Sequence, residues 1–193
     1  MISSMALASY IAKTLTSCIT NGTRASIALS GGSSPIALYE ELSKQAVDWH
    51  RVTVTLIDDR KVPANHRDSN QLLVRETLLQ GRAANAKFIS LEEWPVNQSP
   101  DIGILGMGVD GHIASLFKDN VNKKNKKIVD FVKRKDFSRV TLTLKCLNSS
   151  KNIFLWAPGK GKSNIVKKII SDKKLSYPAS FLKVKNNFLF YSN

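Results

Sequence analysis

Short apolar runs alternate along this chain with longer stretches that have helical spacing. The strand-like segments 25–29, 51–57, 101–105 and 152–156 each lead into a polar, charged or glycine-rich turn, and in 51–57 β-branched residues alternate. Strands separated by helices in this way form a parallel or mostly parallel sheet with helices on both faces. The pattern therefore predicts a doubly wound α/β fold. A length of 193 residues favours a single domain, residues 1–193, over two.

The other elements follow from periodicity and capping signals. Helices are expected over 3–20, from Pro35 to about Gln45, from Ser69-Asn70 to about Leu79, and over 161–170, and further strands near 87–90, 128–132, 139–144 and 188–191. Lys13 interrupts the apolar residues of the first helix, so we interpret the N-terminus as amphipathic rather than as a signal peptide. No run approaches the roughly 18 apolar residues that a membrane span needs.

The positive charge is concentrated in the second part of the chain. Residues 1–117 contain 10 Lys/Arg and 11 Asp/Glu, a net charge of −1, whereas residues 118–193 contain 19 and 4, a net charge of +15. The lysine-rich segment 118–127 is expected to be a solvated loop. Because no stacking aromatics interleave with its lysines and no nucleic-acid-binding spacing is present, nucleic acid is a disfavoured partner. A basic half also raises the encounter rate with an anionic small substrate.

The two cysteines, Cys18 and Cys146, are too few and too far apart for a disulfide framework or a zinc site. This usage is typical of a reducing compartment, and we expect a cytoplasmic protein. No second histidine or cysteine stands at a spacing from His112 that suits a metal ion, so no metal is expected.

Three turns that follow strands, 30–35, 58–60 and 106–112, carry the residues with chemistry. In a parallel sheet they open on the same edge, where ligands bind beyond the carboxyl ends of the strands. Gly31, Gly32 and Ser33 precede a helix N-terminus and are typical of an anion site, although a plain turn with serine caps has the same composition.

The second turn, Asp58-Asp59-Arg60, is consistent with a structural ion pair or with a site. With Arg60 at the end of the neighbouring strand, an anion site becomes the favoured interpretation of the first turn. Adjacent carboxylates on an extended chain point to opposite faces, so at most one of Asp58 and Asp59 is expected to face the site.

The third turn places Asp110 and His112 two residues apart at an expected helix start, which favours a general base with its orienting partner. The glycines of 106–111 also match the dinucleotide fingerprint. That interpretation is disfavoured, since no simple βαβ unit begins there and a dinucleotide turn does not need the histidine. Lys162 stands in a segment similar to a nucleotide-binding loop, but Trp156 occupies the place of the required first glycine. The lysine can still bind a phosphate as a point charge.

Four ordered blocks resemble the 6-phosphogluconolactonases and the wider group that includes the glucosamine-6-phosphate deaminases. The blocks are 29–35; 58–63 with 69–70; 106–117; and 139–144 with 147–148, Gly159 and Lys162. The resemblance as a whole covers about residues 5 to 191. Asp59, Ile113 and Lys118 replace residues that the lactonases prefer. None of these changes removes a chemical group that the reaction uses.

The resemblance implies a doubly wound α/β fold and hydrolysis of 6-phosphogluconolactone to 6-phosphogluconate in the pentose phosphate pathway. It implies that His112 activates water and that Asp110 orients His112. The phosphate-gripping and oxyanion-stabilising residues are expected to be Gly31, Gly32, Ser33, Arg60, Arg139 and Lys162, with Asp58 and Gly108 in support. A sugar phosphate is the implied partner, no metal or organic cofactor is implied, and the oligomeric state is left open.

Two alternatives are retained. The first is isomerisation or deamination of glucosamine 6-phosphate, for which the related enzymes carry a glutamate where this chain has Phe117. Lactone hydrolysis does not need that carboxylate, so Phe117 favours the lactonase. The second is a sugar-phosphate-binding domain without turnover. Regulators of this architecture carry an N-terminal DNA-binding segment, for which we expect no room before the strand near residue 25.

Overall fold

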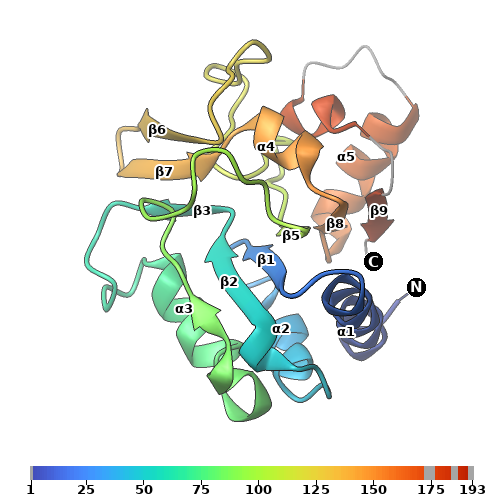
Figure 1. The fold of residues 1–193 in the computed structure, drawn as a ribbon. Helices are drawn as coiled ribbons and strands as arrows, with labels where there is room; N and C mark the ends of the chain where they lie inside the picture. The colour runs from blue at the N-terminus through green and yellow to red at the C-terminus, as the bar shows by residue number, and fades with distance from the viewer. Residues whose placement is uncertain (1, 172–176, 184–186, 191–193) are drawn as a thin grey trace.

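The computed structural model describes residues 2–171, 177–183 and 187–190 (Figure 1). The α-helices are α1 (Ser4–Thr20), α2 (Ile36–Ser43), α3 (Asn70–Thr77), α4 (Leu144–Ser149) and α5 (Lys160–Ser171). The strands are β1 (Ala25–Leu29), β2 (Val52–Leu56), β3 (Asp58–Arg60), β4 (Lys87–Phe88), β5 (Ile102–Leu105), β6 (Val129–Lys133), β7 (Ser138–Leu142), β8 (Asn152–Trp156) and β9 (Asn187–Phe190). Short 3-10 helices cover Trp49–Arg51, Gly81–Asn85 and Pro178–Phe181.

The central sheet contains six parallel strands in the order β4-β2-β1-β5-β8-β9. Every residue of β1 and of β5 is buried. Strands that are covered on both faces expose no side chains to water, so most of their residues are apolar. The exception in β1 is Ser26, whose buried hydroxyl donates a hydrogen bond to Asp101. The expected α/β class with a mostly parallel sheet is confirmed.

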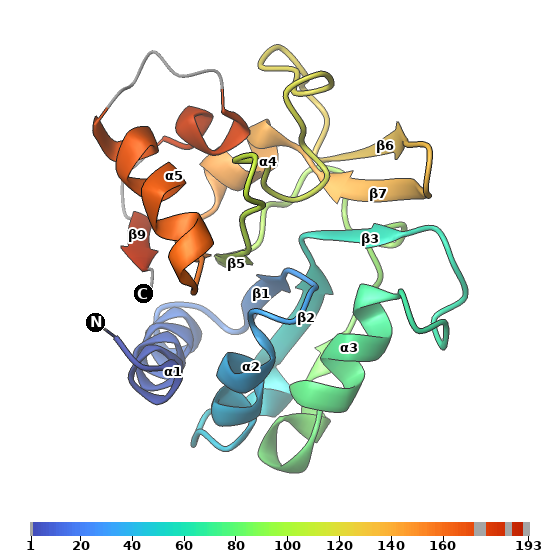
Figure 2. The same cartoon turned by 180° about the vertical axis from the view of Figure 1, so that it is seen from behind.

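Helix α1 forms because its apolar residues recur on one face. Its buried residues are Leu7, Ala8, Ile11, Ala12, Leu15 and Ile19. The Ser3 side chain accepts a hydrogen bond from the Ala6 N–H, which caps the start of the helix, and Asn21 caps its end. Helix α1 packs on α2 and α2 packs on α3, so the three form one layer. The two views place α4 on the other face of the sheet from α2 (Figures 1 and 2).

A second, antiparallel sheet of order β3-β7-β6 stands beyond the carboxyl ends of β2 and β1 (Figure 1). The sequence predicted β6 and β7 as strands, but it presented Asp58–Arg60 as a turn. Those residues become β3 because β7, about eighty positions away in the chain, pairs with them. Pairing of this kind leaves no local signal, so the turn expectation was wrong.

Two further expectations need correction. No helix begins at Asp110–His112: the segment folds back through bridges from Ile113 to Met107 and to Leu116, and Ala114 takes a left-handed φ of 54°. Helix α4, which Thr143 caps by accepting from the Cys146 N–H, was not predicted. The last expected strand is observed as β9, while Tyr191 lies outside the described residues. Within residues 2–171, 177–183 and 187–190, no helix has both the length and the apolarity that crossing a membrane requires.

Candidate active site

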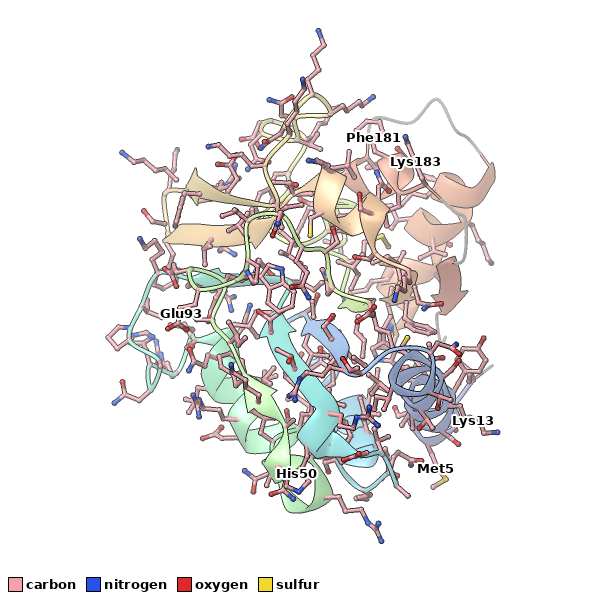
Figure 3. The ribbon with its side chains drawn as sticks, viewed as in Figure 1. Met5, Lys13, His50, Glu93, Phe181 and Lys183 are labelled. Carbon is pink, nitrogen blue, oxygen red and sulfur yellow. The ribbon has the colours of Figure 1, made fainter. Side chains whose placement is uncertain are left out.

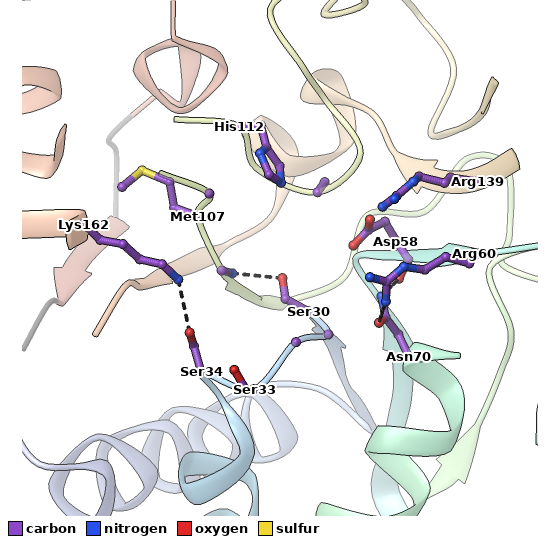
Figure 4. A pocket seen from close by; sticks show the side chains of 15 residues that line it. Ser30, Ser33, Ser34, Asp58, Arg60, Asn70, Met107, His112, Arg139 and Lys162 are labelled. Carbon is purple, nitrogen blue, oxygen red and sulfur yellow. Dashed lines mark hydrogen bonds between the residues drawn. The ribbon is translucent and has the colours of Figure 1, made fainter. Parts of the chain in front are cut away.

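A cavity of about 280 Å³ opens at the carboxyl edge of the central sheet. The turns after β1 and β5 and the strand β3 reach it, together with α3, β7 and the first turn of α5 (Figure 4). Its lining residues are Ser30, Gly31, Gly32, Ser33, Ser34, Asp58, Arg60, Asn70, Gly106, Met107, Gly108, His112, Ala114, Arg139 and Lys162. The three predicted segments therefore meet at one edge of the sheet, although residues 58–60 reach it as strand β3 and not as a turn. Every residue predicted for the site lines the cavity except Asp110, which contacts His112.

The imidazole of His112 lies at the cavity with its Nδ1 atom 2.6 Å from Oδ1 of Asp110. An ionised carboxylate only accepts hydrogen bonds, so Nδ1 carries the proton and Nε2 keeps a free lone pair. Partial burial acts to raise the pKa of Asp110, but hydrogen bonds from the imidazole and from the His112 backbone N–H outweigh it, and the pKa is lowered. Asp110 thus stays ionised and holds the tautomer that a general base needs.

The loop around Gly108 is shaped to hold this pair. The Gly108 N–H donates to the His112 carbonyl and the Gly111 N–H donates to the Gly108 carbonyl, which folds the loop back on itself. A Cβ atom on Gly108 would lie 2.3 Å from both Cε1 and Nδ1 of His112. Only a residue without a side chain lets the imidazole lie against the backbone there.

Asp58 and Asp59 point to opposite faces, as the sequence predicted. Asp58 lines the cavity and accepts a hydrogen bond from the Ser115 Oγ at 2.6 Å. Burial raises the pKa of Asp58, although Ser115 and the charges of the two arginines act in the opposite direction. Asp59 turns toward α3 and accepts from the Ser69 hydroxyl and from two backbone N–H groups at the start of that helix. Asp59 is therefore a structural residue that fixes α3.

Arg60 is fixed at the cavity wall by Asn70. Its Nη1 donates to the Asn70 Oδ1 at 2.7 Å, and the Asn70 amide donates to the Asp58 carbonyl at 2.7 Å. A Cβ atom on Gly31 would lie 1.7 Å from the Asn70 Oδ1. Gly31 is thus needed because Asn70 approaches the turn after β1 this closely.

Arg139 lies directly opposite Arg60 in the register of β3 and β7. Like charges that face each other across two strands are destabilising unless an anion lies between or beside them. The Nε atoms of both arginines are buried and have no hydrogen-bond partner among the described residues. Arg139 also pairs with the exposed Asp136. Both arginines line the cavity, so an anionic ligand there would offset the repulsion between their charges.

Lys162 lies on the other side of the cavity from the arginines, and His112 lies between them (Figure 4). Its Nζ donates to the Ser34 Oγ at 3.1 Å, next to the turn that precedes α2. Burial lowers the pKa of Lys162. An anion at this end of the cavity meets an ammonium group and the backbone of a helix-initiating turn.

Three contributors to the site were not singled out from the sequence as site residues: Asn70, Ser34 and Ser115. The sequence places Asn70 at a helix start, because it follows an N-cap serine, but only the fold brings its side chain to Arg60. Ser115 gives no signal, since its partner Asp58 lies 57 positions away. Across the described part of the chain, no three His, Cys, Asp or Glu side chains come together in a way that suits a metal ion.

The lysine-rich segment lies outside this cavity. Lys123, Lys124 and Lys126 line a separate groove of about 760 Å³, which also includes Phe181 and Lys183. The Lys123 Nζ lies 3.5 Å from the centroid of the Phe181 ring, and Figure 3 shows Phe181 and Lys183 close together. The groove shares no lining residue with the cavity around His112.

Comparisons with known proteins agree with this architecture. The family model described as glucosamine-6-phosphate isomerases/6-phosphogluconolactonase matches residues 3–98 and 83–190. A 6-phosphogluconolactonase of Pseudomonas aeruginosa is 44% identical over 130 residues, which cover 59% of this chain and 55% of that protein. A 6-phosphogluconolactonase of Neisseria meningitidis is 31% identical over an alignment of 209 residues, covering 91% of this chain and 87% of that protein.

The crystal structure of a 6-phosphogluconolactonase from Shewanella baltica superposes with a TM-score of 0.88 at 30% identity. The superposition covers 98% of this chain and 93% of that one. The matches extend over both halves of the chain and include the turns that build the cavity. This chain therefore belongs to the family of glucosamine-6-phosphate isomerases and 6-phosphogluconolactonases.

Proposed function

We propose that this protein hydrolyses 6-phosphogluconolactone to 6-phosphogluconate. The observation that carries the proposal is the His112–Asp110 pair, which presents a free Nε2 at a cavity with cations on two sides. A base between two cationic walls suits a neutral, hydrolysable carbonyl on a molecule that also bears a phosphate.

In the first step, Nε2 of His112 takes a proton from a water molecule while the water oxygen bonds to the lactone carbonyl carbon. The carbonyl oxygen becomes an oxyanion, and Asp110 stabilises the imidazolium that forms. Asp110 remains ionised throughout because its pKa is lowered.

In the second step, the bond between the former carbonyl carbon and the ring oxygen breaks as the oxyanion collapses. The ring oxygen takes the proton from Nε2 of His112, which restores the neutral imidazole. The carboxylic acid so formed loses its proton to solvent, and atoms and charges balance without a cofactor.

The cations bind the phosphate and stabilise the developing charge. Lys162 and the turn of Gly31, Gly32 and Ser33 suit the phosphate, because backbone N–H groups at a helix start and an ammonium group both favour it. Arg60 and Arg139 supply further charge for the phosphate and the oxyanion, with Asp58 between them to limit their mutual repulsion.

Phe117 supports hydrolysis over deamination of an amino-sugar phosphate. The deaminase reaction uses a second acid/base group near the histidine. At the corresponding position this chain has the phenyl ring of Phe117. Of the cavity-lining residues, Asp58 alone carries a carboxyl group, and it is bonded to Ser115.

We also propose that residues 1–193 work as a single domain of this hydrolase type. One continuous cluster of buried apolar residues, from Leu7 to Ala179, supports it. Cys18 and Cys146 are free thiols, which supports a reducing compartment such as the cytoplasm.

The test measures hydrolysis of lactone generated in situ against the spontaneous rate. We expect the wild-type protein to accelerate it and His112→Gln to remove most of the acceleration, about 10²-fold or more. His50→Gln is the matched control, because His50 is exposed on the 3-10 helix Trp49–Arg51, at the far end of the molecule from α4 (Figure 3).

Equal rates for wild type and His112→Gln would refute the mechanism. Ammonia release from glucosamine 6-phosphate would identify the deaminase alternative. Calorimetric binding of 6-phosphogluconate without turnover of the lactone would identify a binding domain.

A further inference from the structure

The His112 imidazole is held by more than its bond to Asp110. The Asp110 side chain is 61% exposed and the His112 side chain 32% exposed, so this hydrogen bond is in contact with water. One exposed hydrogen bond leaves the ring free to tilt about it. A base that works on a bound water needs its lone pair fixed in direction as well as in place.

The ring of Phe117 supplies the second restraint. Its centroid lies 4.5 Å from that of the His112 ring, at an interplanar angle of 33°. Contact between the two faces resists tilting of the imidazole, whereas the hydrogen bond to Asp110 fixes one edge. Phe117 is not among the residues that line the cavity, but its ring lies against two that are. These are His112 and, more distantly, Arg139, whose guanidinium carbon is 5.9 Å from the Phe117 ring centroid.

The backbone of Phe117 is itself fixed by Asn120. The Phe117 N–H donates to the Asn120 Oδ1 at 2.7 Å, and the Asn120 amide donates to the Ser115 carbonyl at 3.1 Å. The backbone N–H groups of Asn120 and Val121 both donate to the Phe117 carbonyl. Both peptide groups of Phe117 are thus bonded, and its side chain has little freedom to move with the loop.

The Phe117 ring is covered by Arg134. The guanidinium carbon of Arg134 lies 4.2 Å from the ring centroid, and the Arg134 Nη1 bonds to the Asp119 Oδ2 at 2.6 Å. Asp119 follows Phe117 closely in the chain, whereas Arg134 follows β6. The ion pair therefore pins the loop that carries Phe117 to the antiparallel sheet.

We propose that Asp119, Arg134 and Phe117 form a relay of positioning residues that orients His112 for its reaction. The inference rests on the proposed function for its kinetic consequence. The geometric consequence stands apart from any activity: in solution the imidazole keeps one orientation, stacked on Phe117, and loses it when the relay is cut.

The kinetic test compares Phe117→Leu with Phe117→Tyr. We expect Phe117→Leu to lower kcat roughly three- to tenfold, the value of a lost ring contact, with KM nearly unchanged. Phe117→Tyr keeps the ring and should restore kcat. Arg134→Gln should lower kcat about two- to fivefold and should have no further effect when added to Phe117→Leu.

A matched pair provides the control. Arg75 lies over the ring of Phe88 with its guanidinium carbon 5.2 Å from the centroid, on α3 and β4 at the other edge of the sheet. Phe88→Leu and Arg75→Gln remove the same kind of contact without touching His112. We expect kcat to be unchanged in both, and thermal unfolding of every variant separates a folding defect from a positioning defect.

Proton NMR of His112 reports the orientation of its imidazole ring directly. A purely structural role of Phe117 and Arg134 would leave this orientation unchanged in a folded variant. In the wild type, the imidazole protons should carry a ring-current shift from Phe117 and show cross-relaxation with its ring protons. Both signals should weaken in Arg134→Gln while the fold stays intact.

A wild type without lactonase activity would refute the proposed function, while these NMR signals would still test the relay. Unchanged imidazole signals in folded Arg134→Gln, or unchanged kcat in folded Phe117→Leu, would overturn the relay. The relay would also be overturned if Arg134→Gln lowered kcat by the same factor in the Phe117→Leu variant as in the wild type.

Discussion

Replacing Gly108 with alanine adds one methyl group directly beneath the His112 imidazole. The new Cβ would lie 2.3 Å from Cε1 and Nδ1 of His112 and 2.6 Å from Oδ1 of Asp110. Non-bonded carbon atoms pack at about 3.5–4.0 Å, so the ring has to retreat by roughly 1 Å or more. Gly108 does not have a left-handed φ, so alanine brings no backbone strain of that kind.

A displacement of roughly 1 Å at a catalytic group can cost about 10²-fold in rate, equivalent to about 2.7 kcal/mol of transition-state stabilisation. We expect Gly108→Ala to lose about that factor in kcat for lactone hydrolysis. KM should stay nearly constant, because Lys162 and the turn after β1 are untouched. The half-exposed imidazole can move toward solvent, so the melting temperature should change little.

The assay follows lactone hydrolysis over the spontaneous rate, with Gly161→Ala as the control. A Cβ on Gly161 meets no atom within 4 Å, so alanine at this position in the first turn of α5 should leave the activity unchanged. If Gly108→Ala retains wild-type kcat, the close packing of His112 against the loop is not required for the reaction. If kcat and melting temperature fall together, the glycine serves the fold instead.

Three further predictions follow from the site. Asp110→Asn removes the ionised acceptor that fixes the Nδ1–H tautomer, and kcat should fall roughly tenfold to a hundredfold, less than the loss of the base itself, with the urea midpoint unchanged. Burial raises the pKa of Asp58, so the wild type loses stability as the pH rises from about 3.9 through the raised value, whereas asparagine does not titrate. The stability of Asp58→Asn relative to the wild type should therefore be greater at pH 7 than below pH 4, which urea unfolding at both pH values checks. Lys162→Met should raise KM about tenfold or more with little change in kcat, because a charge-assisted hydrogen bond to the bound phosphate is lost. A KM equal to that of the wild type would show that Lys162 does not bind the phosphate.

The central sheet could be predicted because its signals are local. β1 and β8 begin and end at the predicted residues, since a strand buried on both faces consists mostly of apolar residues. The start of α3 could be predicted for the same kind of reason, because the Ser69 hydroxyl accepts from the first free N–H groups of that helix.

The antiparallel sheet and the path after His112 could not be predicted in this way. Strand β3 exists only through its pairing with β7, and the loop at 113–116 takes a left-handed turn at Ala114 instead of a helix. Ser115 is drawn inward by Asp58, 57 positions away, and this contact competes with any local preference for a helix.

The sequence by itself determined which chemical groups meet at one edge of the sheet, because parallel strands bring every following turn to that edge. It also determined that Asp58 and Asp59 face opposite ways, since side chains alternate along an extended chain. Only the tertiary structure decided that Asp58 is the residue at the cavity and that Phe117 lies on the His112 ring. The first outcome depends on contacts between distant segments, Asp58 with Ser115 and β3 with β7. The second depends on the fold-back of the loop after His112 and on Arg134, which covers the Phe117 ring from another segment.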